Sequence, residues 1–179
     1  MGLLAAIMLA VYLANPFGTA SLDPRARLLG VALYKIPSRS MEPTLQQGDF
    51  ILANAARYAF AAPQVGDRVV FRFPPQRSIA YVKRIAGIPG DRVRIDGGRL
   101  YVNERPVTEP YLAQQALRQP DSLRMAERTV PAGQYFMLGD NRDNSNDSRY
   151  WGYVPRADLV GRVFAVWYAE DTRRIGSVR

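Results

Sequence analysis

The chain has 179 residues, and 24 Lys and Arg against 16 Asp and Glu give it a formal net charge of +8. This length suits one domain with a small appendage. The positive charge favours an anionic partner, and because no nucleic-acid-binding motif of fixed spacing is present, we rank acidic lipid first and expect no nucleic acid partner. The chain has no Cys and no His, which excludes a Ser-His-Asp triad, a Cys-His pair and a Cys/His zinc site.

The N-terminal stretch is apolar, and no charged side chain precedes Asp23. A helix that spans the hydrocarbon of a bilayer takes about 20 residues, with a lower limit near 17. Residues 2–20 just qualify, so we predict an N-terminal membrane anchor over residues 1–22. The alternative is a cleavable export signal, but the basic N-terminal region of such signals is missing. Arg25 and Arg27 follow the apolar run, and the positive-inside rule would place that side in the cytoplasm.

From Leu28 onward, short runs of branched and aromatic residues alternate with turn residues, which is typical of β-strands. Asp96-Gly97-Gly98 between two such runs indicates a hairpin. Residues 110–128 are less regular and are expected to hold one or two helical turns. We therefore predict one antiparallel or mixed β domain over residues 28–170, followed by a charged, frayed tail over residues 171–179. The expected strands cover residues 32–36, 50–53, 68–73, 80–86, 92–95, 100–102, 106–107, 135–138 and 160–168.

A serine-containing stretch, PSRSMEPTL at residues 37–45, follows the first expected strand. Ser38 and Ser40 lie two residues apart, so an extended backbone would present both hydroxyls on one side. Pro37 and Pro43 stiffen the two flanks. Our hypothesis is that Ser40 is a nucleophile, and the alternative is a Ser/Pro turn on the surface.

A lysine lies inside an apolar strand pattern, in YVKRIAGIPGD at residues 81–91. Strand alternation places Lys83 on the same side as Tyr81 and Ile85, the more apolar set. A lysine that faces a core is costly unless its charge is removed or paired. Lys83 is therefore either a desolvated amine with a lowered pKa that can accept a proton from a hydroxyl, or an edge-strand lysine whose amine reaches solvent.

A third stretch, GDNRDNSNDSRYWGYVP at residues 139–155, is dense in Asp, Asn and Ser and ends in aromatic residues. As a plain surface loop it would form Asx turns and be solvated. The alternation of acids and arginines leading into Trp151 favours a partly buried polar network instead, of the kind that supports a site.

These three stretches, in this order, resemble bacterial type I signal peptidases, and the resemblance runs from about Tyr34 to Val166. It implies a mainly β, signal-peptidase-like domain of short antiparallel strands with one N-terminal membrane helix. It also implies a Ser-Lys dyad, with Ser40 as nucleophile and Lys83 as general base, and neither a metal nor a cofactor.

The resemblance assigns roles to further residues. Ser38 and the backbone N–H of Ser40 match the groups that hold the oxyanion, and Ser145 matches a hydroxyl that orients the lysine amine. Supporting ion pairs are implied for Asp147, Arg149, Asp140 and Arg84. Residues of the substrate pocket are implied at Tyr34, Ile36, Met41, Tyr81 and Val82.

The implied activity is that of a membrane-bound serine endopeptidase that removes N-terminal signal peptides from exported preproteins, after small residues at positions −1 and −3. Its partners would be those signal peptides and the phospholipid bilayer. The expected location is the cytoplasmic (inner) membrane, single-pass, with the catalytic domain on the outer face, because folded domains can translocate despite nearby charge. The apolar residues 28–33 would dip into the bilayer surface.

Two alternatives stay open at this point. A conjugation-type peptidase of the same family would process a pilin rather than general secretory precursors. A self-cleaving repressor-type regulatory domain shares the Ser-Lys mechanism and a similar β fold, but such proteins carry an N-terminal helical DNA-binding domain where this chain has its apolar stretch.

Overall fold

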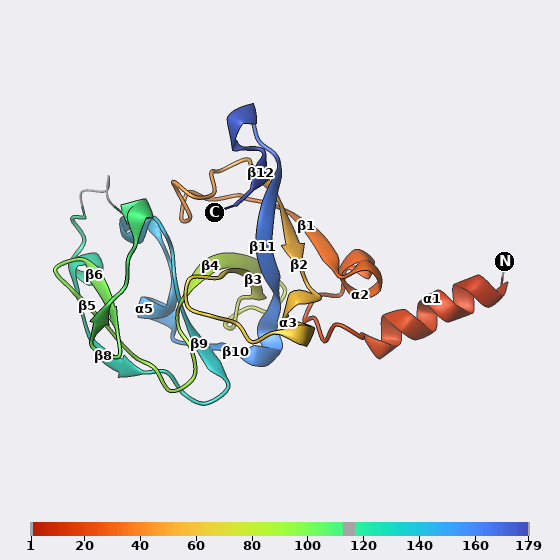
Figure 1. Ribbon diagram of the computed structural model, residues 1–179, viewed down its shortest axis with the longest axis horizontal. Helices are drawn as coiled ribbons and strands as arrows, with labels where there is room; N and C mark the ends of the chain where they lie inside the picture. Colours follow the sequence, from red (N-terminus) through yellow and green to blue (C-terminus); the bar gives the residue numbers. More distant parts are fainter. Residues whose placement is uncertain (1, 113–116, 179) are drawn as a thin grey trace.

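The computed structural model describes residues 2–112 and 117–178, and its strands form two antiparallel sheets (Figure 1). The larger sheet has the order β1-β2-β11-β3-β4-β9-β10, with β12 paired to β11. The predicted mainly β class is confirmed. The strands of this sheet are β1 (Val31–Lys35), β2 (Phe50–Asn54), β3 (Arg68–Arg72), β4 (Ala80–Gly87), β9 (Gln134–Leu138), β10 (Val154–Pro155), β11 (Leu159–Tyr168) and β12 (Gly176–Ser177).

The smaller sheet lies at the opposite end of the molecule from the N-terminal helix (Figure 1). Its order is β7-β6-β5-β8, and its strands are β5 (Arg92–Asp96), β6 (Arg99–Val102), β7 (Arg105–Pro106) and β8 (Arg124–Thr129). The predicted hairpin is present, with Asp96 paired to Arg99 and with positive φ at Gly97 and Gly98. Two successive residues with positive φ are what the tightest hairpin turns require, and glycine adopts that conformation without strain.

The helices are short. The α-helices are α1 (Gly2–Ala14), α2 (Pro24–Leu29), α3 (Arg57–Phe60), α4 (Pro120–Leu123) and α5 (Ser148–Trp151), and the 3₁₀ helices are η1 (Pro110–Leu112), η2 (Arg142–Asn144), η3 (Arg156–Asp158) and η4 (Thr172–Arg174). The Asp23 side chain caps α2 by accepting from Arg25 N, and Asp147 caps α5 in the same way by accepting from Arg149 N. These polar caps satisfy donors that a helix N-terminus leaves free.

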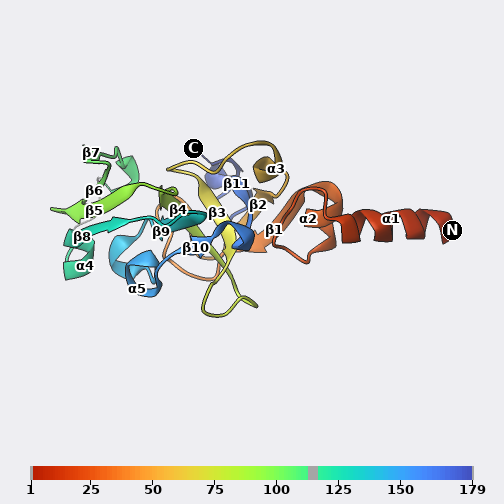
Figure 2. The same ribbon diagram turned by 90° about the horizontal axis from the view of Figure 1, so that it is seen from below.

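The N-terminal helix α1 is shorter than the predicted membrane anchor and projects away from the β domain (Figure 2). It has 13 residues and ends at Ala14, because the chain turns at Asn15, which has a φ of +46°, just before Pro16. Among the residues that the structure describes, no helix has the length and apolar character to cross a membrane. The spanning helix expected over residues 2–20 is therefore corrected to a short helix with all its side chains accessible.

Two other segments differ from the sequence prediction. Strand β8 forms within the stretch expected to hold only helical turns, while residues 113–116 of that stretch lie outside the described residues. The tail does not fray: Ala165 pairs with Ser177 and Val166 with Gly176, so β12 adds to the larger sheet. In both segments backbone pairing to a neighbouring strand supplies the order that a charged sequence does not indicate.

The three largest apolar clusters of the described residues lie against these sheets. One joins β2 and β11 to the segment after β1 through Ile36, Met41 and Leu45. A second surrounds Phe71 and Ile85. The third, around Val93 and Phe136, joins the smaller sheet to the end of β9. Since the first cluster includes residues on either side of Ser40, packing of the core also fixes the position of this serine.

Candidate active site

The predicted nucleophile Ser40 lies on the loop of residues 36–49 between β1 and β2, which we call the Ser40 loop. Two backbone hydrogen bonds close its neck, Ile36 N to Asp49 O and Gly48 N to Ile36 O, both 2.8 Å. Met41 and Leu45 are buried in the core beneath it. The loop is thus anchored at its base and on its inner face, and Ser40 itself is buried.

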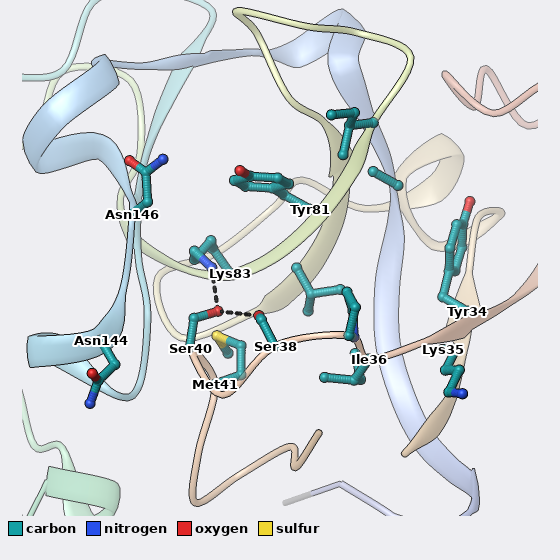
Figure 3. A pocket seen from close by; sticks show the side chains of 14 residues that line it. Tyr34, Lys35, Ile36, Ser38, Ser40, Met41, Tyr81, Lys83, Asn144 and Asn146 are labelled. Atoms are coloured by element: carbon teal, nitrogen blue, oxygen red, sulfur yellow. Dashed lines mark hydrogen bonds between the residues drawn. The ribbon is translucent and has the colours of Figure 1, made fainter. Parts of the chain in front are cut away.

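Strand β4 brings Lys83 to this serine. Lys83 Nζ donates a hydrogen bond to Ser40 Oγ at 2.6 Å, and Ser38 Oγ lies 3.3 Å from the same oxygen (Figure 3). The amine also lies 5.4 Å from the centre of the Tyr81 ring, so Lys83 and Tyr81 share a side of β4, as the alternation predicts. Side chains 43 positions apart in the sequence therefore meet as a hydroxyl–amine pair.

The Lys83 residue is 4% exposed. Burial lowers the pKa of Lys83 from its ordinary 10.5 to about 8, because water no longer stabilises the ammonium form. The charges of Asp147 and Asp140 raise this pKa, and the charge of Arg149 lowers it. A pKa near 8 leaves an appreciable neutral fraction at ordinary pH. Only the neutral amine can accept a proton.

The next residue of β4 ties this strand to the Ser40 loop. Arg84 makes a two-pronged ion pair with Asp140, with Nε 2.8 Å from Oδ1 and Nη2 2.6 Å from Oδ2. Thr44 Oγ1 of the Ser40 loop donates to Asp140 Oδ2 at 2.5 Å. The Asp140 side chain is fully buried, so these charge-assisted bonds form away from water, where they are strong.

A second buried ion pair holds the segment after β9. Arg149 Nε lies 2.8 Å from Asp147 Oδ1, and Nη2 lies 3.0 Å from Oδ2. Asp147 Oδ2 also accepts from Gly139 N at 3.0 Å. The two ion pairs implied by the resemblance thus form, Arg84 with Asp140 and Arg149 with Asp147.

Close packing at Gly139 leaves no room for a larger residue. A Cβ built there would lie 2.2 Å from Ser145 Oγ and 2.6 Å from Ser40 O. Asn141 N donates to that same carbonyl of Ser40 at 3.0 Å. Ser145 Oγ is buried and has no hydrogen-bond partner among the described residues, so its predicted role in orienting the lysine amine stays a prediction.

A groove of about 360 Å³ opens beside Ser40 and Lys83 (Figure 3). Its walls come mainly from the end of β1, the first part of the Ser40 loop and the start of β4. All five residues predicted for the substrate pocket line it: Tyr34, Ile36, Met41, Tyr81 and Val82. Sequence analysis missed other lining residues, among them Ile79, Ala80, Asn144 and Asn146.

The missed support residues Thr44, Gly139 and Asn141 all lie within the motifs that the sequence analysis singled out. Their position inside these motifs is the signal that could have identified them. Their supporting contacts join the Ser40 loop to the third motif, between residues about 100 positions apart. Spacing within one motif does not reveal such contacts.

Comparison with known proteins places the chain in a family. The family described as "Signal peptidase, peptidase S26" matches residues 3–168. Signal peptidase I of Pseudomonas aeruginosa is 42% identical, over 75% of this chain and 63% of that protein. Signal peptidase I of Leptolyngbya laminosa is 39% identical, over 79% of this chain and 71% of that protein.

Among solved structures, a signal peptidase I from Enterococcus faecalis is similar with a TM-score of 0.49 and 32% sequence identity, covering 57% of this chain and 97% of the other. This chain spans about 63% of the length of its Pseudomonas aeruginosa relative. The family match covers most of the chain, including all three motifs and the groove beside Ser40. The chain therefore belongs to the signal peptidase family, peptidase S26.

Proposed function

We propose that this chain is a serine endopeptidase that removes N-terminal signal peptides from exported preproteins by means of a Ser40-Lys83 dyad. The observation that carries the proposal is the 2.6 Å hydrogen bond between Lys83 Nζ and Ser40 Oγ at a buried position. A serine hydroxyl is a weak nucleophile until a neighbouring base takes its proton, and a buried amine with a pKa of about 8 is such a base.

In the acylation half of the reaction, neutral Lys83 takes the hydroxyl proton while Ser40 Oγ forms a bond to the carbonyl carbon of the substrate. The carbonyl π electrons move to its oxygen, where the Ser40 N–H and the Ser38 hydroxyl donate hydrogen bonds. Such donors are worth roughly 2.7–4 kcal/mol each in comparable enzymes. The carbon–nitrogen bond then breaks, and the Lys83 ammonium gives its proton to the leaving amine.

Deacylation uses the same groups with water as the nucleophile. Neutral Lys83 takes a proton from water, and the water oxygen bonds to the ester carbon. The ester bond to Ser40 Oγ breaks as the tetrahedral species collapses, and the serine oxygen regains a proton from Lys83. The cycle ends with the free acid of the signal peptide and the original state of both side chains.

The groove supports a substrate with small side chains. Positions −1 and −3 of an extended peptide lie on the same side of its backbone. That side would face aliphatic and thioether groups of Ile36, Met41 and Val82, all of which line the groove. A pocket walled by such bulky groups has room for small residues, so we propose cleavage after small residues at −1 and −3.

Exposed apolar surface supports a lipid partner. Apart from Tyr12, whose ring lies under Arg27, the side chains of α1 are exposed among the described residues, and a helix that is apolar all round requires an apolar environment. A second apolar surface, which we call the β1 face, includes Leu29, Leu33, Leu52 and Trp167 and surrounds a hollow of about 250 Å³. We propose that both surfaces contact the phospholipid bilayer and that the β domain lies on the outer side of the cytoplasmic membrane.

The test is to incubate the purified chain with a preprotein in detergent and to identify the new N-terminus by mass spectrometry. Wild type should cut once, after the small residue that ends the signal peptide, with a rate that rises with pH to a plateau above about 8, because only neutral Lys83 acts. Ser40→Ala and Lys83→Met should each lower the rate by at least roughly a thousandfold.

Arg105→Met is the matched control for Lys83→Met, because Arg105 is an exposed basic residue of β7 in the smaller sheet. It should cleave at the wild-type rate. Full activity in Ser40→Ala or Lys83→Met, with circular dichroism showing intact folding, would remove the dyad from the mechanism.

A further inference from the structure

The C-terminal segment returns along the larger sheet to the Ser40 loop (Figure 1). After β11 the chain reverses through η4, where Asp171 Oδ1 accepts from Arg173 N at 3.1 Å. The segment then pairs with β11 as β12, and Val178 packs against the first apolar cluster. This path brings the side chain of Arg174 to residues 43–49 of the Ser40 loop, which we call the outer side of the loop.

Arg174 binds the Ser40 loop at three acceptors. Its Nη1 donates to Pro43 O at 3.3 Å, and its Nη2 donates to Thr44 O at 3.3 Å and to Asp49 Oδ2 at 2.7 Å. The side chains of Arg174 and Asp49 are 17% and 3% exposed. Asp49 Oδ2 also accepts from Gln46 N at 2.8 Å, so one guanidinium group and one carboxylate fix most of residues 43–49.

The Ser40 loop is therefore held from two sides. On the catalytic side, Asn141 N donates to Ser40 O, and Asn141 Nδ2 donates to Arg39 O at 3.1 Å. On the outer side, Arg174 donates to the carbonyl of Thr44, a residue only four positions after Ser40. The side chain of Thr44 donates in turn to Asp140, the ion-pair partner of Arg84 beside Lys83.

We propose that Arg174 is a positioning residue, which holds the Ser40 loop so that Ser40 Oγ stays within hydrogen-bond distance of Lys83. It contacts neither of the two reacting side chains and acts through the backbone of Pro43 and Thr44 and through Asp49. A displacement of about 1 Å between reacting groups can lower a rate by roughly a hundredfold. The kinetic consequence rests on the proposed peptidase function, whereas the effect on the loop does not.

The first measurement is amide hydrogen exchange, which reports opening of the loop without any assay of activity. Arg174→Ala should speed exchange in peptides that cover residues 37–48 by roughly tenfold, since charge-assisted hydrogen bonds within a partly buried site are lost. Exchange in the β5–β6 hairpin should not change. Arg173→Ala is the matched control, because the Arg173 side chain is 89% exposed and pairs with Asp171.

The second measurement is the rate of preprotein cleavage. Arg174→Ala should lower kcat by roughly tenfold to a hundredfold with KM within about twofold of wild type, and Arg173→Ala should match wild type. Arg174→Lys, which can keep the contact with Asp49 but not the planar fork that reaches both carbonyls, should fall between them. The double variant Asp49→Asn/Arg174→Ala should lower kcat by a smaller factor than the product of the factors for the two single variants.

The outcomes separate the two proposals. Unchanged exchange in residues 37–48, or equal acceleration there and in the β5–β6 hairpin, overturns the positioning role whatever the activity. Faster exchange in the loop with kcat unchanged also overturns it. If wild type does not cleave any preprotein, the exchange measurement still decides whether Arg174 holds the loop. If Arg174→Ala does not fold, the same comparisons are made with Arg174→Lys.

Discussion

The surroundings of Ser40 and the apolar surfaces of α1 and the β1 face differ from an ordinary protein surface in opposite ways. Around Ser40, charged side chains are buried: Asp140, Asp147 and Arg149 are at most 6% exposed. On α1 and the β1 face, large apolar side chains are exposed, with Leu29 at 72% and Trp167 at 65%. Both arrangements are costly unless the group in question has a suitable partner.

The two regions obtain their partners differently. Each buried carboxylate near Ser40 has an arginine from the same chain at ion-pair distance. Lys83 differs, since its hydrogen-bond partner is a hydroxyl rather than a carboxylate, and burial accordingly lowers its pKa. Most of the large apolar side chains on α1 and the β1 face, by contrast, stay exposed or half-buried among the described residues. The described chain thus pairs its buried carboxylates internally, whereas large apolar side chains of α1 and the β1 face stay exposed.

Breaking a buried ion pair should have the largest effect on stability. Asp147→Asn leaves the charge of Arg149 uncompensated, with that side chain 2% exposed, and the loss of a partner in such pairs typically costs about 3–5 kcal/mol. Urea unfolding at pH 7 measures the change. Glu104→Gln is the matched control, because its pair with Arg92 is exposed and should contribute no more than about 1 kcal/mol. Equal losses in both variants would contradict the comparison.

Much of the fold could be predicted from local patterns. The hairpin around Gly97 and Gly98 forms where its turn residues indicate, and the apolar strands form where branched and aromatic runs occur. Strand β8 was missed because its sequence, RMAERT, lacks an apolar pattern. The strand forms through its pairing with β5. The end of α1 was missed because composition alone does not reveal the left-handed turn at Asn15.

The two central residues of the site could also be predicted, since Ser40 and Lys83 each lie in a recognisable motif, and the structure brings them together. The contacts that hold them could not. Thr44 meets Asp140 across 96 positions, and Arg174 meets Thr44 across 130. The first contact depends on how β9 pairs beside β4, and the second on how β11 and β12 return the chain to the Ser40 loop. Sequence spacing carries no information on either path.

Removing the buried amine should stabilise the protein. Below about pH 8, Lys83 is charged in both the folded and the unfolded chain, and folding carries the full cost of burying that charge. Between about pH 8 and pH 10.5 the unfolded chain alone binds the proton, so the stability of wild type rises with pH. The difference between the pKa values of Lys83 in the unfolded and the folded chain corresponds to about 3 kcal/mol of unfolding free energy. At pH 7, Lys83→Met should be more stable than wild type by about that amount.

Chemical denaturation at pH 7, 8 and 9 checks this prediction, with Lys35→Met as the matched control because Lys35 is exposed on β1. The advantage of Lys83→Met should shrink between pH 8 and pH 9, whereas Lys35→Met should differ little from wild type throughout. An advantage that is the same at every pH would show that the gain comes from packing of the methionine and not from removal of a buried charge.

The smallest expected effect concerns the β1 face. Full burial of a leucine side chain contributes about 1.5–3 kcal/mol of free energy, and a leucine that is only partly inserted at the lipid boundary contributes less to binding. Leu29→Ser combined with Leu33→Ser should therefore weaken binding to anionic liposomes by roughly tenfold, as measured by co-sedimentation. Ser40→Ala can serve as the background for both variants, which separates binding from cleavage.

Leu123→Ser is the matched control for this measurement. Leu123 is also an exposed leucine, 39% accessible, but α4 lies at the end of the molecule opposite α2 (Figure 2). If the β1 face contacts lipid, this substitution leaves liposome binding unchanged, because the far end never reaches the bilayer. Equal weakening by both sets of substitutions would mean that binding follows overall hydrophobicity, and unchanged binding in the Leu29 and Leu33 variant would assign the lipid contact to α1 alone.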